Sequence, residues 1–178
     1  MAWLPNLLTC LRILLTPLII RDVLDGHCEF ALWLSLIAGL SDAADGFLAR
    51  RFNWSSRLGA YLDPVADKFL LTGLYISFGI SGVAPPALAW LVVCRDVIIL
   101  AMVGGAFALT SIRDFPPSIP GKISTLFQIT GALILLGSCA EVPLTDAVVP
   151  LTTILVAAAT VVSGVHYIWR ATTVVRST

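Results

Sequence analysis

The sequence predicts an all-α fold in which six helices span a membrane and both termini lie on the cytoplasmic side. Of its 178 residues, 58% are hydrophobic and only 12% are charged, and the mean hydropathy is +0.94. An ordinary soluble domain carries about 25% charged residues. The apolar segments lack period-2 alternation, and backbone groups in lipid must be paired within the protein, so we expect helices rather than barrel strands.

Six long apolar segments, which predict the six helices, follow one another along the chain. They run from Leu7 to Ile20, Ala31 to Leu48, Leu58 to Ile80, Leu88 to Ala108, Ile123 to Cys139 and Val148 to Trp169. The separating stretches carry charges or turn formers and are predicted loops: RDVLDGHCE, RRFNWSSR, SGVAPP, SIRDFPPSIPGK and AEVPLTD. The first segment lacks the charged start of a signal peptide and contains Arg12, so we interpret it as the first span. We therefore expect a single membrane domain over residues 1–178.

The basic residues predict the orientation of these spans. With a cytoplasmic N-terminus, only Arg21 lies outside the membrane on the far side. The cytoplasmic connections and tail then hold Arg50, Arg51, Arg57, Arg113, Lys122, Arg170 and Arg176. This asymmetry obeys the positive-inside rule, and the expected location is a bacterial inner membrane with the site on its cytoplasmic side. No basic stretch interleaves with aromatic residues, so we expect no nucleic-acid partner.

The four cysteines are Cys10, Cys28, Cys94 and Cys139, which lie far apart and mostly within apolar segments. Their spacing predicts neither a disulfide framework nor a metal site. We expect them to pack in the core, as free cysteines commonly do.

Four aspartates gather in residues 41–69 of this apolar chain. Asp42 and Asp45 are three residues apart and Asp63 and Asp67 are four apart, so each pair shares one helix face. An aspartate near the middle of a membrane helix costs on the order of 3 kcal/mol, which calls for a partner or a wet cavity. Two antiparallel helices joined by RRFNWSSR would bring the pairs together, and their hard oxygen ligands would suit Mg²⁺ or Mn²⁺.

Other interpretations of the aspartates stay open. They could line a polar channel or pair with Arg12, Lys68 and Arg95, and a membrane cation transporter could use paired aspartates. An intramembrane prenyltransferase also clamps a diphosphate through acidic motifs, but those motifs usually lie on well-separated helices of a longer chain. Here 26 residues, counted from position 42 to position 67, hold both pairs.

The spacing of eight residues resembles the signature of the CDP-alcohol phosphotransferase family, membrane enzymes that make phospholipids. These residues are Asp42, Asp45, Gly46, Ala49, Arg50, Gly59, Asp63 and Asp67. The opening LPNLLTCLRILLTPLI is similar to the family's first helix. The stretch LDPVADKFLL is typical of its phosphatidylglycerophosphate synthases and of eukaryotic-type cardiolipin synthases. The resemblance covers nearly the whole chain.

The resemblance implies that CDP-diacylglycerol donates its phosphatidyl group to an alcohol and that CMP leaves. It implies two divalent cations, Mg²⁺ or Mn²⁺, held by the four aspartates, with Asp67 also taking the proton of the incoming hydroxyl. Gly46 and Ala49 would make room for the cytidine nucleotide, Arg50 would hold a phosphate oxygen, and Gly59 would give backbone access near the ligand. By analogy with the family, we expect a homodimer.

The acceptor alcohol depends on the fourth apolar segment. Its Arg95-Asp96-Val97 resembles the Arg-Asp-Val of eukaryotic-type cardiolipin synthases, which favours phosphatidylglycerol as acceptor and cardiolipin as product. The alternative is glycerol 3-phosphate, as in phosphatidylglycerophosphate synthases, and Lys122 in SIPGKIST occurs in both groups. Arg95 and Lys122 are the candidate phosphate ligands, although Arg95 and Asp96 could instead form an ion pair that only positions the helix. A lipid acceptor would need an apolar opening between helices beside the aspartates.

Overall fold

The protein is a bundle of α-helices, as the sequence predicts. The computed structural model describes residues 3–52, 57–109 and 118–176, with side chains over residues 9–41, 63, 65–102, 118–170 and 172. The six helices of this part are α1 (Trp3–Leu24), α2 (Cys28–Phe52), α3 (Arg57–Ser81), α4 (Pro86–Leu109), α5 (Ile119–Cys139) and α6 (Val148–Arg176). Each predicted apolar segment lies inside one helix, which confirms the all-α prediction.

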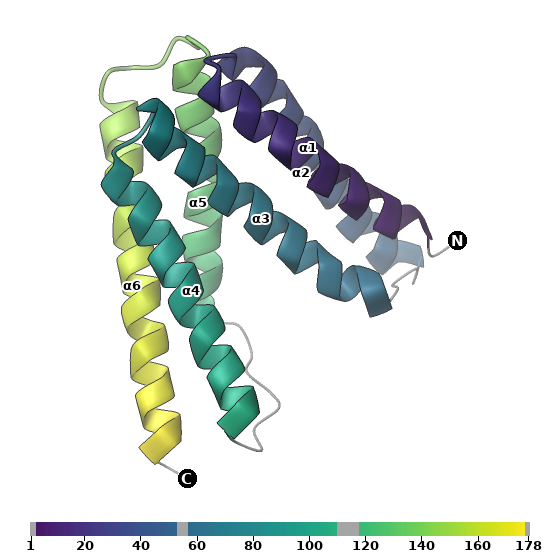
Figure 1. Ribbon diagram of the computed structural model, residues 1–178, viewed down its shortest axis with the longest axis vertical. Coiled ribbons are helices and arrows are strands. Elements are labelled where there is room, and N and C mark those ends of the chain that lie inside the picture. The colour runs from purple at the N-terminus through teal and green to yellow at the C-terminus, as the bar shows by residue number, and fades with distance from the viewer. Residues whose placement is uncertain (1–2, 53–56, 110–117, 177–178) are drawn as a thin grey trace.

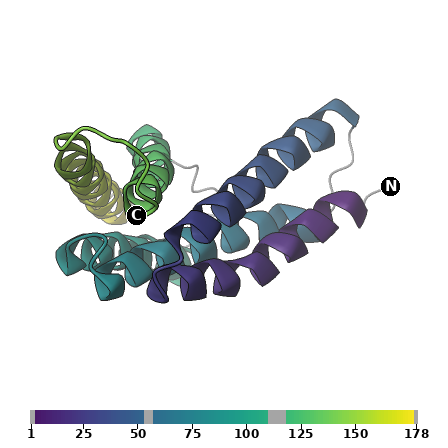
Figure 2. The same cartoon turned by 90° about the horizontal axis from the view of Figure 1, so that it is seen from above.

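The helices converge at one end and diverge at the other (Figure 1). The convergent end, which we call the closed end, holds the connections 25–27, 82–85 and 140–147. The opposite end, the open end, holds both chain termini. Helix α1 packs against α2 and α3, α4 packs against α3 and α6, and α5 packs against α2, α3 and α6. Seen from above, α1, α2 and α3 extend to one side of α5 and α6 (Figure 2).

Four of the five predicted loops were too long, because the helices extend into them. At the closed end α1 continues to Leu24 and α2 begins at Cys28. Arg21 Nε donates to Asp25 Oδ2 at 3.2 Å, an i,i+4 contact that supports the last turn. The chain then reverses at Gly26, whose φ of 80° is a left-handed conformation that glycine adopts without strain. The stretch RRFNWSSR likewise contributes its first three residues to α2.

A disulfide links Cys28 at the start of α2 to Cys139 at the end of α5, with the two Cα atoms 5.6 Å apart. The expectation that all four cysteines are free core residues was therefore wrong. The two bonded residues are 111 positions apart in sequence, and only the antiparallel packing of α2 and α5 brings them together. Cys10 and Cys94 are free thiols, and both are exposed.

The buried face of α1 changes character along its length. Thr9, Arg12, Thr16, Ile19 and Val23 are between 0% and 2% exposed and follow one another at spacings of three and four residues. These spacings place them on a single stripe of the helix. The stripe is polar in the half nearer the open end and apolar in the half nearer the closed end.

Small residues allow two helix pairs to approach closely. A Cβ atom at Gly73 of α3 would lie 2.5 Å from Cδ1 of Ile20 on α1. One at Gly131 of α5 would lie 2.5 Å from Cγ2 of Val156 on α6. A side chain at Gly131 would therefore push α5 and α6 apart, whereas at Gly73 the end of the Ile20 side chain would have to shift. Such close contacts at small residues are typical of membrane helices.

Large apolar side chains face outward on every helix. Examples taken one from each helix are Leu14, Trp33, Ile80, Trp90, Leu126 and Ile154. Two helical segments of the described chain are long and apolar enough to cross a membrane: Ile119–Cys139, with a mean hydropathy of 1.4, and Val148–Arg170, with 2.1. Length and composition alone identify these two segments, so the crossing of all six helices stays a prediction.

Candidate active site

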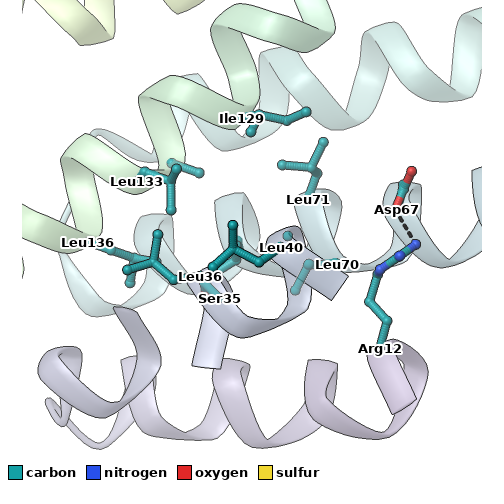
Figure 3. A pocket seen from close by; sticks show the side chains of 13 residues that line it. Arg12, Ser35, Leu36, Leu40, Asp67, Leu70, Leu71, Ile129, Leu133 and Leu136 are labelled. Atoms are coloured by element: carbon teal, nitrogen blue, oxygen red, sulfur yellow. Dashed lines mark hydrogen bonds and ion pairs between the residues drawn. The ribbon is translucent and has the colours of Figure 1, made fainter. Parts of the chain in front are cut away.

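Two of the predicted site aspartates, Asp63 and Asp67, lie one turn apart on α3 and contact α1. The Thr9 hydroxyl donates a hydrogen bond to Oδ1 of Asp63. Arg12 Nη1 lies 2.6 Å from Oδ1 of Asp67 and forms an ion pair with it (Figure 3). Residues four apart on α3 thus face residues three apart on α1, which follows from the helical repeat of the two packed helices.

The two members of the Arg12–Asp67 pair have different surroundings. The Arg12 side chain is 2% exposed, whereas that of Asp67 is 46% exposed. The Thr16 hydroxyl donates to the Arg12 carbonyl oxygen at 2.8 Å, which satisfies this buried hydroxyl locally. A buried guanidinium holds a half-exposed carboxylate at the edge of the bundle, so the outer part of Asp67 stays within reach of a ligand.

A second charged cluster lies on the side of α3 that faces α4. Lys68 Nζ contacts Oδ1 of Asp96 at 2.6 Å, and Arg95 Nη1 contacts the same oxygen at 2.8 Å. Arg95 also donates to Ser163 Oγ on α6 from Nε at 3.2 Å and from Nη2 at 2.7 Å. Its Nη2 approaches the Gly121 carbonyl oxygen of α5 at 3.5 Å. The cluster joins four helices beside the aspartates.

The two candidate phosphate ligands occupy different environments. Arg95 is 6% exposed, and all three of its guanidinium nitrogens donate to protein groups. The Arg95–Asp96 ion pair that the sequence left open as an alternative is present, and a phosphate-binding role for Arg95 stays a prediction. Lys122 is exposed on the first turn of α5, where Ser118 caps the helix by accepting from the Gly121 amide at 3.2 Å.

An apolar groove of about 300 Å³ opens beside Asp67. Arg12 and Asp67 lie at one end of it, and mostly leucine side chains of α2, α3 and α5 line the remainder (Figure 3). Among them are Leu40 of α2, Leu71 of α3 and Leu133 of α5. A charged end joined to a long apolar wall matches the two ends of a phospholipid, a headgroup and a hydrocarbon chain.

The remaining signature residues fall where the structure describes no side chains. They are Asp42, Asp45, Gly46, Ala49, Arg50 and Gly59. Within the described side chains, no group of three or more His, Cys, Asp or Glu residues could hold a metal ion. Asp63 and Asp67 nonetheless offer hard oxygen donors from one face of α3, which suits Mg²⁺ or Mn²⁺.

The sequence interpretation missed one contact of the aspartates. Thr9 was not considered, and Arg12 entered only as a possible ion-pair partner. The available signal was the polar stripe of Thr9, Arg12 and Thr16 at spacings of three and four within an otherwise apolar segment. In a membrane helix such a stripe predicts a polar partner on the adjacent helix.

Comparison with known families gives one match, to CDP-alcohol phosphatidyltransferase, over residues 2–169. Three relatives illustrate the similarity among curated proteins. A Mycobacterium tuberculosis protein provisionally named a cardiolipin synthase is 36% identical over 140 residues, which are 76% of this chain and 65% of that protein. The cardiolipin synthase (CMP-forming) of Rattus norvegicus is 42% identical over 100 residues, 56% of this chain and 33% of the rat protein.

The third relative carries a different name. The CDP-diacylglycerol–glycerol-3-phosphate 3-phosphatidyltransferase of Aquifex aeolicus is 38% identical over 125 residues, which are 69% of each chain. The aligned part of this chain therefore spans about two thirds of the mycobacterial and Aquifex relatives and one third of the rat one. Relatives named cardiolipin synthase and a relative named for glycerol 3-phosphate therefore match at similar identity.

Proposed function

This chain belongs to the CDP-alcohol phosphatidyltransferase family, and on that premise we propose that it transfers a phosphatidyl group from CDP-diacylglycerol to an alcohol and releases CMP. The observation that carries the proposal is the place of Asp67, one helical turn from Asp63 on α3, at the charged end of an apolar groove. A lipid diphosphate could lie there with its phosphates at the carboxylates and a hydrocarbon chain against the leucines.

In the proposed reaction, Asp67 accepts the proton of the acceptor hydroxyl. The hydroxyl oxygen attacks the phosphorus of the phosphatidyl group, and the bond from that phosphorus to the CMP oxygen breaks. Asp42, Asp45, Asp63 and Asp67 would hold two divalent cations, Mg²⁺ or Mn²⁺. When bound, these would neutralise charge on the diphosphate.

The nucleotide part of the proposed site comes from the remaining signature residues. Gly46 and Ala49 leave room for the cytidine nucleotide, Gly59 allows close backbone approach, and Arg50 holds a phosphate oxygen. The half-exposed carboxylate of Asp67 supports its role as the base, because a fully enclosed carboxylate could not reach a substrate hydroxyl.

For the acceptor, we favour phosphatidylglycerol, which would give cardiolipin. The groove beside Asp67 supports a lipid that enters sideways from the bilayer. Lys122, exposed near the cluster around Arg95, could hold a single phosphodiester, whereas Arg95 would first have to exchange its contacts with Asp96 and Ser163. Glycerol 3-phosphate is the second candidate, because the Aquifex relative is named for that acceptor.

The proposed setting is a bacterial inner membrane crossed six times, with the open end in the cytoplasm. The apolar side chains that face outward on every helix support the proposed membrane location. The disulfide supports the orientation, because it lies at the closed end, and disulfides persist in the oxidising space outside the cytoplasm. A homodimer is proposed from the family alone.

An acceptor assay tests this function. Purified full-length protein would receive labelled CDP-diacylglycerol, Mg²⁺ or Mn²⁺, and in turn phosphatidylglycerol, glycerol 3-phosphate, inositol or serine. Chromatography of the lipid product should show cardiolipin from the phosphatidylglycerol reaction alone. Product with glycerol 3-phosphate alone would replace the acceptor assignment, and no product with any acceptor would contradict the transferase itself.

A further inference from the structure

The polar half of the α1 stripe has a specific partner on α3. Where membrane helices pack, the stripe between them ordinarily holds apolar, small or hydroxyl side chains, and a buried arginine in it is exceptional. On α1 it is apolar only at Ile19 and Val23, near the closed end, and it is polar at Thr9 and Arg12. These polar residues are the ones that contact the α3 carboxylates.

The two contacts differ in charge. Thr9 is fully buried and offers Asp63 a neutral hydroxyl donor. Arg12 offers Asp67 a full positive charge from a guanidinium that is 2% exposed. Both contacts hold the Oδ1 atom of their carboxylate, so both fix the direction in which the rest of the carboxylate points.

We propose that Thr9 and Arg12 are positioning residues that orient Asp63 and Asp67 for a divalent cation, with opposite effects on how tightly that cation is held. The inference rests on the proposed metal-binding role of the two aspartates and concerns residues of α1 outside the eight-residue signature. Thr9 strengthens the binding of the cation, and Arg12 weakens it while holding Asp67 in place.

Thr9 assists because a neutral hydrogen bond orients a carboxylate without removing its charge. Groups that hydrogen-bond to metal ligands typically contribute a factor of about 10 to 100 in metal affinity. Thr9→Val keeps the branched shape and loses the donor, so Asp63 would be free to turn away. Thr9→Ser keeps the hydroxyl and should restore the affinity.

Arg12 weakens cation binding because its guanidinium and a cation at the same carboxylate, that of Asp67, repel one another. Solvent screens this repulsion only in part, because Arg12 is buried while Asp67 is half-exposed. Removing the charge with Arg12→Gln should therefore tighten cation binding by about tenfold, while the less constrained Asp67 lowers turnover. Arg12→Lys keeps the charge but not the rigid fork, so its affinity should stay near that of the wild type.

The test measures Mn²⁺ binding by calorimetry on the purified full-length protein in detergent at neutral pH, without any nucleotide lipid. We expect the dissociation constant to rise at least tenfold in Thr9→Val and to fall about tenfold in Arg12→Gln. Thr9→Ser and Arg12→Lys should lie within about threefold of the wild type. Thermal unfolding of each variant reports folding, and a purely structural role would weaken Mn²⁺ binding in both neutral variants alike.

The outcomes separate this inference from the function beneath it. If the wild type binds Mn²⁺ and Thr9→Val binds it equally well, the inference fails while the metal site stands. Weaker binding in both Thr9→Val and Arg12→Gln overturns the opposed roles. If Arg12→Gln does not fold, the Thr9 variants alone decide. A wild-type protein that binds no Mn²⁺ contradicts both the inference and the metal-dependent function.

Discussion

The two ends of the helix bundle are built differently. At the closed end, connections of three and four residues join α1 to α2 and α3 to α4, and a disulfide ties α2 to α5. Small residues such as Ala31 and Ala84 are buried there. Toward the open end the helices diverge (Figure 1), and near the middle of α1 and α4 the buried residues are charged instead: Arg12, Arg95 and Asp96.

The contrast suggests a division of labour between stability and chemistry. Buried charges are costly to keep in an apolar bundle, and a site that binds a charged ligand needs room between its helices. A closed end held by short connections and a covalent bond fixes the helices at one point. The diverging helices can then leave a half-exposed carboxylate such as Asp67 within reach of a charged ligand, which a tightly packed core would not allow.

The largest expected effect is at the open end. Asp67→Asn should lower transfer about a thousandfold, equivalent to about 4 kcal/mol of transition-state stabilisation, because the amide cannot accept the hydroxyl proton. Binding of a CDP-lipid should be largely retained, since the amide carbonyl can still contact a cation. The measurement is turnover with labelled CDP-diacylglycerol beside a binding titration. Turnover within tenfold of the wild type would exclude Asp67 as the base.

The next effect is at the closed end and concerns stability alone. Replacing Cys28 and Cys139 together by serine should lower the free energy of unfolding by about 2 kcal/mol. That is the low end for a disulfide, because membrane-embedded helices keep the unfolded chain restricted. Turnover at 25 °C should change less than threefold. Serine at Cys10 and Cys94 is the matched control. Equal unfolding temperatures in the two double variants would show that the disulfide at the closed end does not stabilise the protein.

A smaller effect is expected in the groove between the two ends. Leu133→Trp fills the apolar wall and should raise the KM for the lipid substrate about tenfold, equivalent to about 1.4 kcal/mol, without changing Mn²⁺ affinity. Leu126→Trp places the same side chain on an outward face of α5 and serves as the control. Equal KM values for these two variants would show that the substrate does not use the groove.

The smallest expected effect concerns an exposed ion pair, in contrast to the Arg12–Asp67 pair, whose guanidinium is buried. Arg21 and Asp25 form an i,i+4 pair at the closed end whose side chains are 76% and 47% exposed. Asp25→Asn should change the free energy of unfolding by less than about 0.5 kcal/mol, because such pairs are screened by solvent. Denaturant unfolding measures the change. A loss above 1 kcal/mol would mean that an exposed ion pair at the closed end contributes as much to stability as an ion pair at the site.

The helices were predictable because long apolar segments in this composition allow few other structures. Helix ends were less predictable: the stretch from Arg21 to Glu29 carries charges and a glycine, yet only residues 25–27 leave the helices. The disulfide could not be predicted from spacing. Cys28 and Cys139 meet only because α2 packs against α5, which is a tertiary contact that no local pattern encodes.

The site was predictable in part, from charge in an apolar context. Asp63 and Asp67 share a face of α3 as their spacing predicted, and Arg12 is one of the partners weighed for them. Thr9 escaped notice, because a threonine in a membrane helix usually satisfies its hydroxyl within its own helix. The pairing of Lys68 and Arg95 with Asp96 depends on how α3, α4 and α6 pack together.

The most direct test measures CMP release from CDP-diacylglycerol by the wild-type protein, first after a chelator has removed divalent cations and then after they are added back. Without Mg²⁺ or Mn²⁺ we expect no CMP. When either cation is added together with the acceptor lipid, we expect CMP and phospholipid product in equal amounts. Full CMP release in the presence of chelator would contradict a carboxylate-held metal at the open end. Cation binding with no CMP release under any condition would contradict the transferase and favour a cation transporter.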